Sequence, residues 1–178
     1  MKTTVLLFHP NLPESRVNLA LINGLDDDIE VRDMYDLYPD FKIDVATEQK
    51  VLLEADRVVL QFPMHWYGAP ALTKQWEDDV LEYGWAYGTG GTALEGKEVV
   101  IAVSPGAKNY GRDGFAKYTV HELLRPFQAT SRFTHTRFIK PFITDGASSI
   151  ADDALASQVE KYNEYLHQAR LEALADFE

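Results

Sequence analysis

Cysteine is absent from this sequence of 178 residues. Without a thiol the chain forms no disulfide, thiolate nucleophile, cysteine zinc site or cysteine-ligated iron–sulfur cluster from its own side chains. Positive charge is also scarce, because 28 acidic residues outnumber 17 lysines and arginines and leave a net charge of −11. That balance argues against nucleic-acid binding and against docking on anionic membranes, since both require a basic face.

Long apolar runs are missing as well. No stretch of the sequence approaches the roughly 20 apolar residues that cross a bilayer. The chain opens directly into the apolar segment Lys2–Phe8, without the charged region and cleavage site of a secretory signal. We therefore expect no membrane insertion and a cytoplasmic location.

Several motifs with defined chemistry do not occur. The sequence contains no G-x-G-x-x-G, no Walker A pattern and no G-x-S-x-G elbow. Its five histidines form no His-x-x-x-His pair, and the run Asp26–Asp28 lacks the alternation of a calcium loop. These absences predict a protein without a metal site and without hydrolase chemistry.

What is present suits one folded domain over residues 1–178, because 46% of the residues are apolar and 12% are aromatic. Four apolar runs predict strands, and three of them lack the alternation of a half-exposed strand, as expected when both faces are covered. A fifth run alternates in part and suits an edge strand. These five runs are Thr4–Phe8, Ile29–Arg32, Arg57–Phe62, Glu98–Val103 and Arg132–Ile139.

Segments of helical period separate the strands. Ser15 and Asp44 are the expected N-caps of the first two helices, and Pro70 is expected to open the third. A fourth helix is expected within residues 114–127, ending near Pro126, and a fifth over residues 155–169. Alternating strands and helices predict right-handed βαβ units and a flavodoxin-like α/β fold: a five-stranded parallel sheet in the order 2-1-3-4-5, with helices on both faces.

Ligands of such a sheet bind beyond the carboxyl ends of the strands, here in the loops after the first, third and fourth strands. The first loop runs from His9 to Asn18 into a helix N-terminus, which favours an anion. Ser15 offers a hydroxyl, Asn18 an amide and Arg16 a charge. The alternative is an ordinary turn in which Ser15 only caps the helix.

The second loop, Gln61–Pro70, carries Trp66 and Tyr67 between two prolines. Exposed aromatics there would cover a flat ring or a partner, and the alternative is that both fold into the core. The third loop, residues 104–111, is rich in small residues that let the backbone approach a ring edge, although ordinary turns share this composition. An aromatic and glycine-rich insertion over residues 83–92 predicts either a partner surface or a connector.

In combination these segments resemble a known family, the NAD(P)H:quinone oxidoreductases of the flavodoxin-like superfamily. The resemblance extends to about residue 142, and short bacterial members include ancillary flavoproteins of glutathione-gated potassium-efflux systems. It implies a bound flavin, NAD(P)H as co-substrate, and two-electron hydride transfer to a quinone-like acceptor. It also implies a homodimer. The absence of an extra adenosine-binding segment favours FMN over FAD. The motifs that carry the resemblance are His9-Pro10 with Ser15 and Asn18, Gln61-Phe62-Pro63 with Trp66-Tyr67 and Pro70-Ala71-Leu72, and Tyr83-Gly84-Trp85-Ala86-Tyr87-Gly88.

The resemblance further implies roles for individual residues. Tyr110 would assist hydride transfer, and Tyr87 would reach the substrate pocket of the neighbouring subunit. In the third loop the chain has Ser104-Pro105-Gly106-Ala107 where many members have Thr-Thr-Gly-Gly, and Pro105 has no N–H to offer a flavin carbonyl. The implied flavin contacts are His9, Ser15, Arg16, Val17 and Asn18 for the phosphate, Pro63, Met64, Trp66 and Tyr67 for the ring, and Ser104 and Gly106 for the ring edge.

Two other functions remain open. One, which the potassium-efflux resemblance suggests, is a regulatory flavoprotein subunit that docks on a transporter. The other is a one-electron shuttle, against which the aromatic insertion and the expected dimer argue. The sequence leaves the choice between NADH and NADPH, and the physiological acceptor, undecided.

Overall fold

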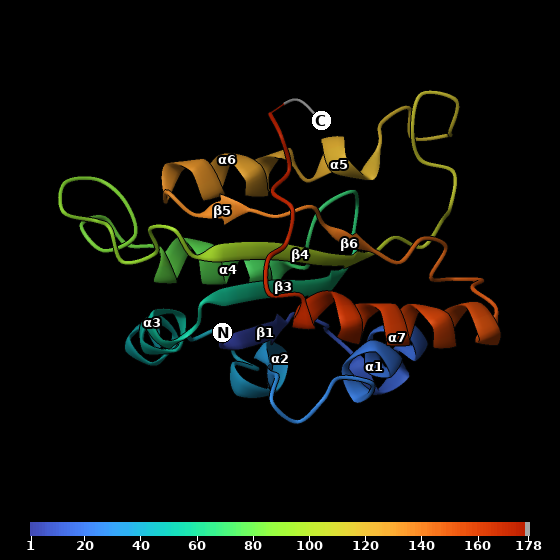
Figure 1. The fold of residues 1–178 in the computed structure, drawn as a ribbon, viewed down its shortest axis with the longest axis horizontal. Helices are drawn as coiled ribbons and strands as arrows, with labels where there is room; N and C mark the ends of the chain where they lie inside the picture. The colour runs from blue at the N-terminus through green and yellow to red at the C-terminus, as the bar shows by residue number, and fades with distance from the viewer. Residues whose placement is uncertain (177–178) are drawn as a thin grey trace.

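The computed structural model describes residues 1–176, which form one twisted sheet of six strands with helices on both sides (Figure 1). Every pairing in the sheet is parallel, and the order is β2-β1-β3-β4-β5, with β6 also paired to β4. The predicted order and fold class are therefore confirmed. The strands are β1 (Thr3–Leu7), β2 (Glu30–Asp33), β3 (Arg57–Pro63), β4 (Glu98–Ser104), β5 (Arg137–Phe138) and β6 (Phe142–Ile143).

The fifth position of the sheet differs from the prediction of one strand over Arg132–Ile139. Two short strands, β5 and β6, share this edge, and Arg132 still belongs to a helix. On the edge, three residues separate Phe138 from Phe142, whereas only two separate their partners Val99 and Ala102 on β4. The extra residue makes a bulge, and Pro141, which has no N–H for the ladder, lies within it.

The helices begin largely where capping residues predict. Ser15 Oγ accepts the N–H of Asn18 at 3.1 Å, and Asp44 Oδ1 accepts the N–H of Thr47 at 3.0 Å. The helix expected to end near Pro126 is wrong, because α5 ends earlier and Pro126 lies in the first turn of α6, where a missing N–H costs nothing. The helices are η1 (Leu12–Glu14), α1 (Arg16–Asn23), α2 (Met34–Leu37), α3 (Val45–Glu54), α4 (Ala71–Val80), α5 (Val120–Leu123), α6 (Arg125–Phe133) and α7 (Asp152–His167).

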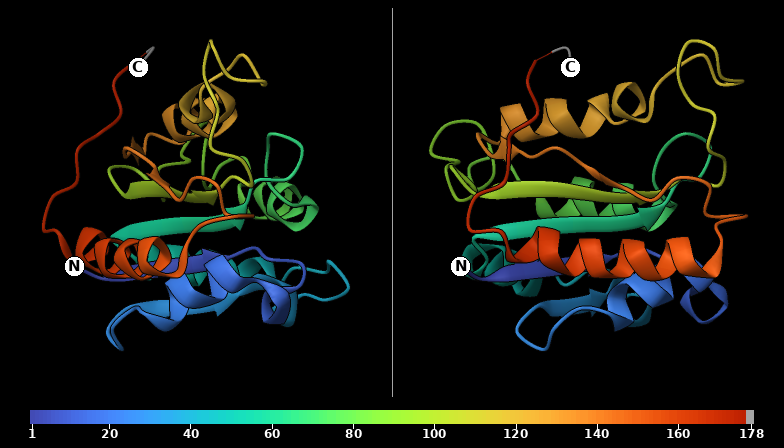
Figure 2. Two further views of the ribbon diagram at one scale, coloured as in Figure 1. Left: turned by 90° about the vertical axis from the view of Figure 1, so that its right-hand side faces the viewer. Right: turned by 45° about the vertical axis from the view of Figure 1, so that its right-hand side comes forward.

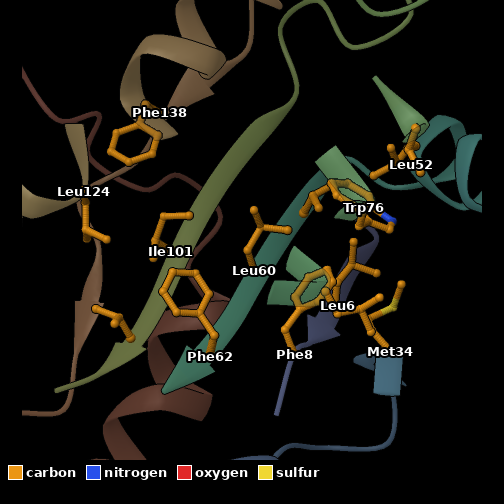
Figure 3. Packing of buried hydrophobic residues seen from close by; sticks show 14 of the residues in the cluster. Leu6, Phe8, Met34, Leu52, Leu60, Phe62, Trp76, Ile101, Leu124 and Phe138 are labelled. Carbon is orange, nitrogen blue, oxygen red and sulfur yellow. The ribbon is translucent and has the colours of Figure 1, made fainter. Parts of the chain in front are cut away.

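Helices α1 and α7 pack on one face of the sheet and α4 on the other (Figure 2). Successive residues of each central strand enter opposite cores, which is why their sequences show no polar alternation. The larger core includes Phe8 and Trp76, whose rings meet edge-on at 6.0 Å (Figure 3). Strand residues of this core include Leu6, Leu60 and Ile101, and those of the other include Val5, Val59 and Val100.

The arrowheads of β3 and β4 point the same way, so the loops that follow β1, β3 and β4 gather at one edge of the sheet (Figure 1). Among the helices of the described chain, none is long and apolar enough to cross a membrane.

Candidate functional site

The three loops meet at Ser104, the last residue of β4. Its carbonyl accepts the N–H of Met64 from the second loop at 3.2 Å. Its hydroxyl accepts the side-chain amide of Asn18, which follows the first loop, at 2.9 Å. The structure therefore brings predicted residues from all three loops together at the carboxyl edge of the sheet.

The N-terminus of α1 opens into this junction. Ser15 Oγ accepts both the backbone N–H of Asn18, at 3.1 Å, and its side-chain amide, at 3.4 Å. The N–H groups of Arg16 and Val17 stand in the first turn, where a helix provides no internal acceptor. The Val17 side chain is buried in the core, so the residue can serve an anion only through its backbone.

The charge of Arg16 is directed away from the helix end. Its guanidinium donates to the carbonyl of Ile150 at 2.7 Å and forms an ion pair with Asp152, at the start of α7. The first loop is thereby tied to α7. A direct phosphate contact by the Arg16 side chain stays a prediction.

His9 is partly buried beside the second loop. Its Nδ1 accepts the N–H of Asn11 at 3.1 Å. Burial lowers the pKa of His9, and the neighbouring His65 lowers it further, while Asp33 acts in the opposite direction. We therefore expect a neutral imidazole at neutral pH.

A chain of buried polar groups runs from the core to the junction. The Tyr162 hydroxyl donates to Gln61 Oε1 at 2.9 Å, and Gln61 Nε2 donates to Asn18 Oδ1 at 3.3 Å. Sequence reasoning did not assign Gln61 or Tyr162 to the site. The signal for Gln61 was a polar residue inside an otherwise apolar strand, whereas Tyr162 fitted the apolar stripe of its helix and gave no such signal.

The second loop contains a tight two-residue turn. His65 and Gly68 exchange two backbone hydrogen bonds, at 2.9 and 3.0 Å. The residues between them, Trp66 and Tyr67, both have left-handed backbones, with φ of 47° and 66°. Such conformations are unfavourable for residues with a side chain and concentrate at functional sites. The Trp66 side chain is 94% exposed and Tyr67 44%, so neither folds back into the core.

The third loop is held by the segment that follows β6. The carbonyls of residues 105–107 accept N–H groups of residues 146–148 at 2.9 to 3.2 Å. Among the described residues, no acceptor faces the N–H groups of Gly106 and Ala107, and Pro105 has none to offer. A Cβ at position 106 would come 2.9 Å from Ser148 Oγ, so a larger residue there would require the Ser148 side chain to move.

Tyr110, near the end of this loop, packs against Phe115, with ring centroids 5.6 Å apart. Burial raises the pKa of Tyr110, and the nearby Tyr67 and Asp145 add to the effect, so the phenol keeps its proton at neutral pH. A pocket of about 210 Å³ opens here, lined by Lys108, Tyr110, Thr119, Val120, His121, Ile143 and Asp145.

Tyr87 lies on a separate aromatic surface. Its ring packs against Phe133 at 4.9 Å and against Tyr83 at 5.8 Å. A groove of about 490 Å³ between the second loop, α4 and α6 has both Tyr67 and Tyr87 in its walls. Tyr83 and Phe133 are 67% and 63% exposed, an unusual amount of aromatic surface for so small a region.

Comparison with known proteins places this geometry in context. A family model described as "Flavodoxin-like fold" matches residues 1–166. The chain is 48% identical over 170 residues to a protein named uncharacterized NAD(P)H oxidoreductase YrkL of Bacillus subtilis, covering 93% of this chain and 98% of that protein. It is 40% identical over 167 residues to the glutathione-regulated potassium-efflux system ancillary protein KefF of Salmonella schwarzengrund, covering 91% and 93%.

Two solved structures are similar over nearly their whole length. A structure named a thermophilic tryptophan halogenase (Th-Hal) from Streptomycin violaceusniger superposes with a TM-score of 0.91 at 47% identity, covering 94% of this chain and 99% of that chain. General stress protein 14 of Treponema denticola, in complex with FMN, superposes with a TM-score of 0.86 at 37% identity, covering 93% and 98%. Because these names differ on one fold, the reaction has to be argued from the site.

Proposed function

The chain belongs to the flavodoxin-like fold family, and from this membership we propose that it is a flavin-dependent NAD(P)H:quinone oxidoreductase. The observation that carries the proposal is the junction at Ser104. There a helix N-terminus with two serine hydroxyls stands beside a turn that presents two exposed aromatic side chains. A phosphate needs the first of these features and a planar ring needs the second.

The residues present fit the phosphate of a flavin nucleotide. Free N–H groups of Arg16 and Val17, the positive end of α1 and the hydroxyl of Ser15 all favour a bound anion. We assign FMN rather than FAD, because the structure of the Treponema relative holds FMN at 37% identity. His9 and Asn18 complete the phosphate end.

The ring end is built from the second and third loops. Pro63 and Met64 lead into the turn of Trp66 and Tyr67, whose exposed faces provide a stacking surface. The N–H groups of Gly106 and Ala107 have no acceptor among the described residues and are available to a ring edge.

When bound, the flavin supplies the two-electron redox chemistry by which hydride passes from NAD(P)H to a quinone-like acceptor. The protein provides the stacking surface and donors for developing negative charge. Tyr110 is such a donor, because its raised pKa keeps the O–H in place across the neutral range. Because the turn is exposed, it excludes few acceptor molecules. Azo and nitroaromatic compounds are therefore further acceptors that the site would admit.

A homodimer is part of the proposal. The exposed aromatics Tyr83 and Phe133 and the groove between α4 and α6 form a surface that a second copy would cover. Tyr87 would then reach the partner's substrate pocket. Sedimentation velocity tests this: a monomer at micromolar concentration would contradict it.

A second function has a specific observation in its favour, the 40% identity to the potassium-efflux ancillary protein of Salmonella. In that case the chain docks on a transporter and its turnover is incidental. Normal flavin binding with negligible NAD(P)H turnover, or co-purification with a transporter, would favour this alternative.

The deciding experiment is the visible absorption spectrum of FMN-reconstituted protein before and after anaerobic NADPH. Bound-flavin bands that bleach fully support the proposed function, and failure to bind flavin overturns it. Parallel double-reciprocal lines for varied NADPH and quinone would show that both substrates use one slot in turn. Intersecting lines would contradict the shared slot.

A further inference from the structure

The buried hydrogen bonds from Tyr162 through Gln61 and Asn18 to the junction form a relay, and this relay has a direction. Tyr162, Gln61, Asn18 and Ser104 are all at most 4% exposed, so these four polar residues are almost entirely buried. Buried polar groups need partners, and each member of this chain has one. The orientation of one amide therefore decides the orientation of the next.

Tyr162 sets the direction at the inner end. Its only described hydrogen-bond partner is Gln61, and burial raises the pKa of the phenol, so the group keeps a proton that it must donate. Gln61 consequently turns Oε1 toward Tyr162 and Nε2 toward Asn18 Oδ1, at 2.9 and 3.3 Å. The opposite orientation would leave a phenol proton buried without an acceptor.

The direction reaches the site through Asn18. With Oδ1 accepting from Gln61, its Nδ2 donates to Ser104 Oγ at 2.9 Å and to Ser15 Oγ at 3.4 Å. The Oγ atoms of Ser15 and Ser104 then both accept hydrogen bonds from Asn18. Among the described residues, neither hydroxyl hydrogen has an acceptor. The Ser15 hydroxyl, at the N-terminus of α1, is therefore left to donate to an anion bound there.

We propose that Tyr162 and Gln61 are positioning residues that, through Asn18, make Ser15 a hydrogen-bond donor to the phosphate of the cofactor. The inference rests on the proposed function, because it assumes that a flavin phosphate occupies the junction. It goes further by assigning the selectivity for a phosphorylated flavin to two residues remote in sequence. With the amides reversed, Asn18 Oδ1 would accept the Ser15 proton, and Ser15 would face the phosphate with lone pairs.

The test compares FMN with riboflavin, which lacks the phosphate, by fluorescence titration of the purified chain. Gln61→Met has nearly the shape of glutamine but carries no hydrogen-bonding group. We expect its preference for FMN over riboflavin to fall roughly 10- to 100-fold, the range for hydrogen bonds to a charged group, while riboflavin affinity changes little. Gln128→Met is the matched control, since Gln128 is also a buried glutamine, 4% exposed, but lies outside the relay.

A second pair of variants keeps the proposal falsifiable if Gln61→Met fails to fold. Tyr162→Phe removes the inner donor, and the same preference should fall by a smaller factor because Gln61 keeps its bond to Asn18. Tyr165→Phe is its control, since that hydroxyl donates to the Lys140 carbonyl at 2.5 Å.

Three outcomes are distinguishable. A lower FMN preference in the relay variants, and not in the controls, supports the proposal. Folded relay variants with the wild-type preference, or with equal losses for both flavins, overturn it. Wild-type protein that binds neither flavin overturns the proposed function itself, and the phosphate role of the relay with it.

Discussion

The side-chain amide of Asn18 lies 2.9 Å from the hydroxyl of Ser104, although 86 residues separate them in the sequence. Asn18 belongs to the first turn of α1 and Ser104 ends β4, so this bond joins the phosphate end of the proposed site to its ring end. Loss of either partner leaves the other buried without its bond.

Substitution of Ser104 by Ala should weaken FMN binding by roughly tenfold, because it removes a hydroxyl at the ring end and leaves the buried Asn18 amide without that acceptor. Fluorescence titration measures the effect. Ser131→Ala is the control, since Ser131 is also buried but bonds with Thr136 away from the junction. Equal affinities in both variants would show that Ser104 contributes only to packing.

Substitution of Trp66 by Gly should separate stability from function. The residue is 94% exposed with φ of 47°, so glycine relieves an unfavourable backbone and loses little burial. We expect the free energy of unfolding to stay within about 1 kcal/mol of wild type, or to rise. We expect KM for NADPH to rise roughly 3- to 10-fold, because the stacking surface of Trp66 at the ring end of the site is lost.

Urea unfolding and steady-state kinetics check this prediction. His135→Gly is the control, because His135 is exposed with φ of 57° and precedes β5 at the opposite edge of the sheet. It should share the stability effect and leave KM unchanged. A loss of more than 2 kcal/mol in Trp66→Gly would contradict the exposed, strained turn.

Glu77 should make stability fall as pH rises. Burial raises the pKa of Glu77 to about 7, with Lys74 opposing the shift and Asp78 adding to it. Because the pKa in the folded state lies above the ordinary value of 4.5, protonated Glu77 contributes to the free energy of unfolding. This contribution is complete below pH 4.5 and is lost as pH rises through 7. At pH 8, Glu77→Gln should be more stable than wild type by about 2–3 kcal/mol.

Denaturant unfolding at pH 5 and pH 8 measures the Glu77 effect. Glu160→Gln, at an exposed position of α7, should show no comparable difference between the two pH values. A constant gap between Glu77→Gln and wild type across this range would contradict the raised pKa.

Substitution of Arg57 by Met should be strongly destabilising. Arg57 is fully buried; its Nε donates to Glu98 at 2.7 Å, and two further donors hold the carbonyls of Leu166 and Gln168 at 2.6 and 2.9 Å. Removing one partner of such a network costs about 3–5 kcal/mol, because both carbonyls lose their donor and Glu98 keeps, among the described residues, only its partly exposed partner Arg137.

Urea unfolding tests the Arg57 prediction. Arg132→Met serves as its control, since Arg132 forms an exposed ion pair with Asp176 and should change stability by less than about 1 kcal/mol. Similar effects of the two substitutions would contradict the buried network.

The central elements were predictable because their signals are local. Apolar runs located β1, β3 and β4, and the caps Ser15 and Asp44 marked helix starts from side-chain chemistry within one turn. The edge was not predictable in this way. Residues 132–136 alternate like a strand, yet they close α6 and the turn after it, since packing of α6 against the sheet outweighs a weak local preference.

The sequence by itself determined the fold class and the three loops that carry the proposed site, because these depend on periodicity and on residues close together in the chain. The strand order was inferred from the fold class. Only the tertiary structure decided how these loops are joined and oriented. Gln61 and Tyr162 meet across 101 residues, and Asn18 and Ser104 across 86. A hydrogen bond requires two groups within about 3 Å, and no local pattern records which distant side chains the folded sheet brings to that distance.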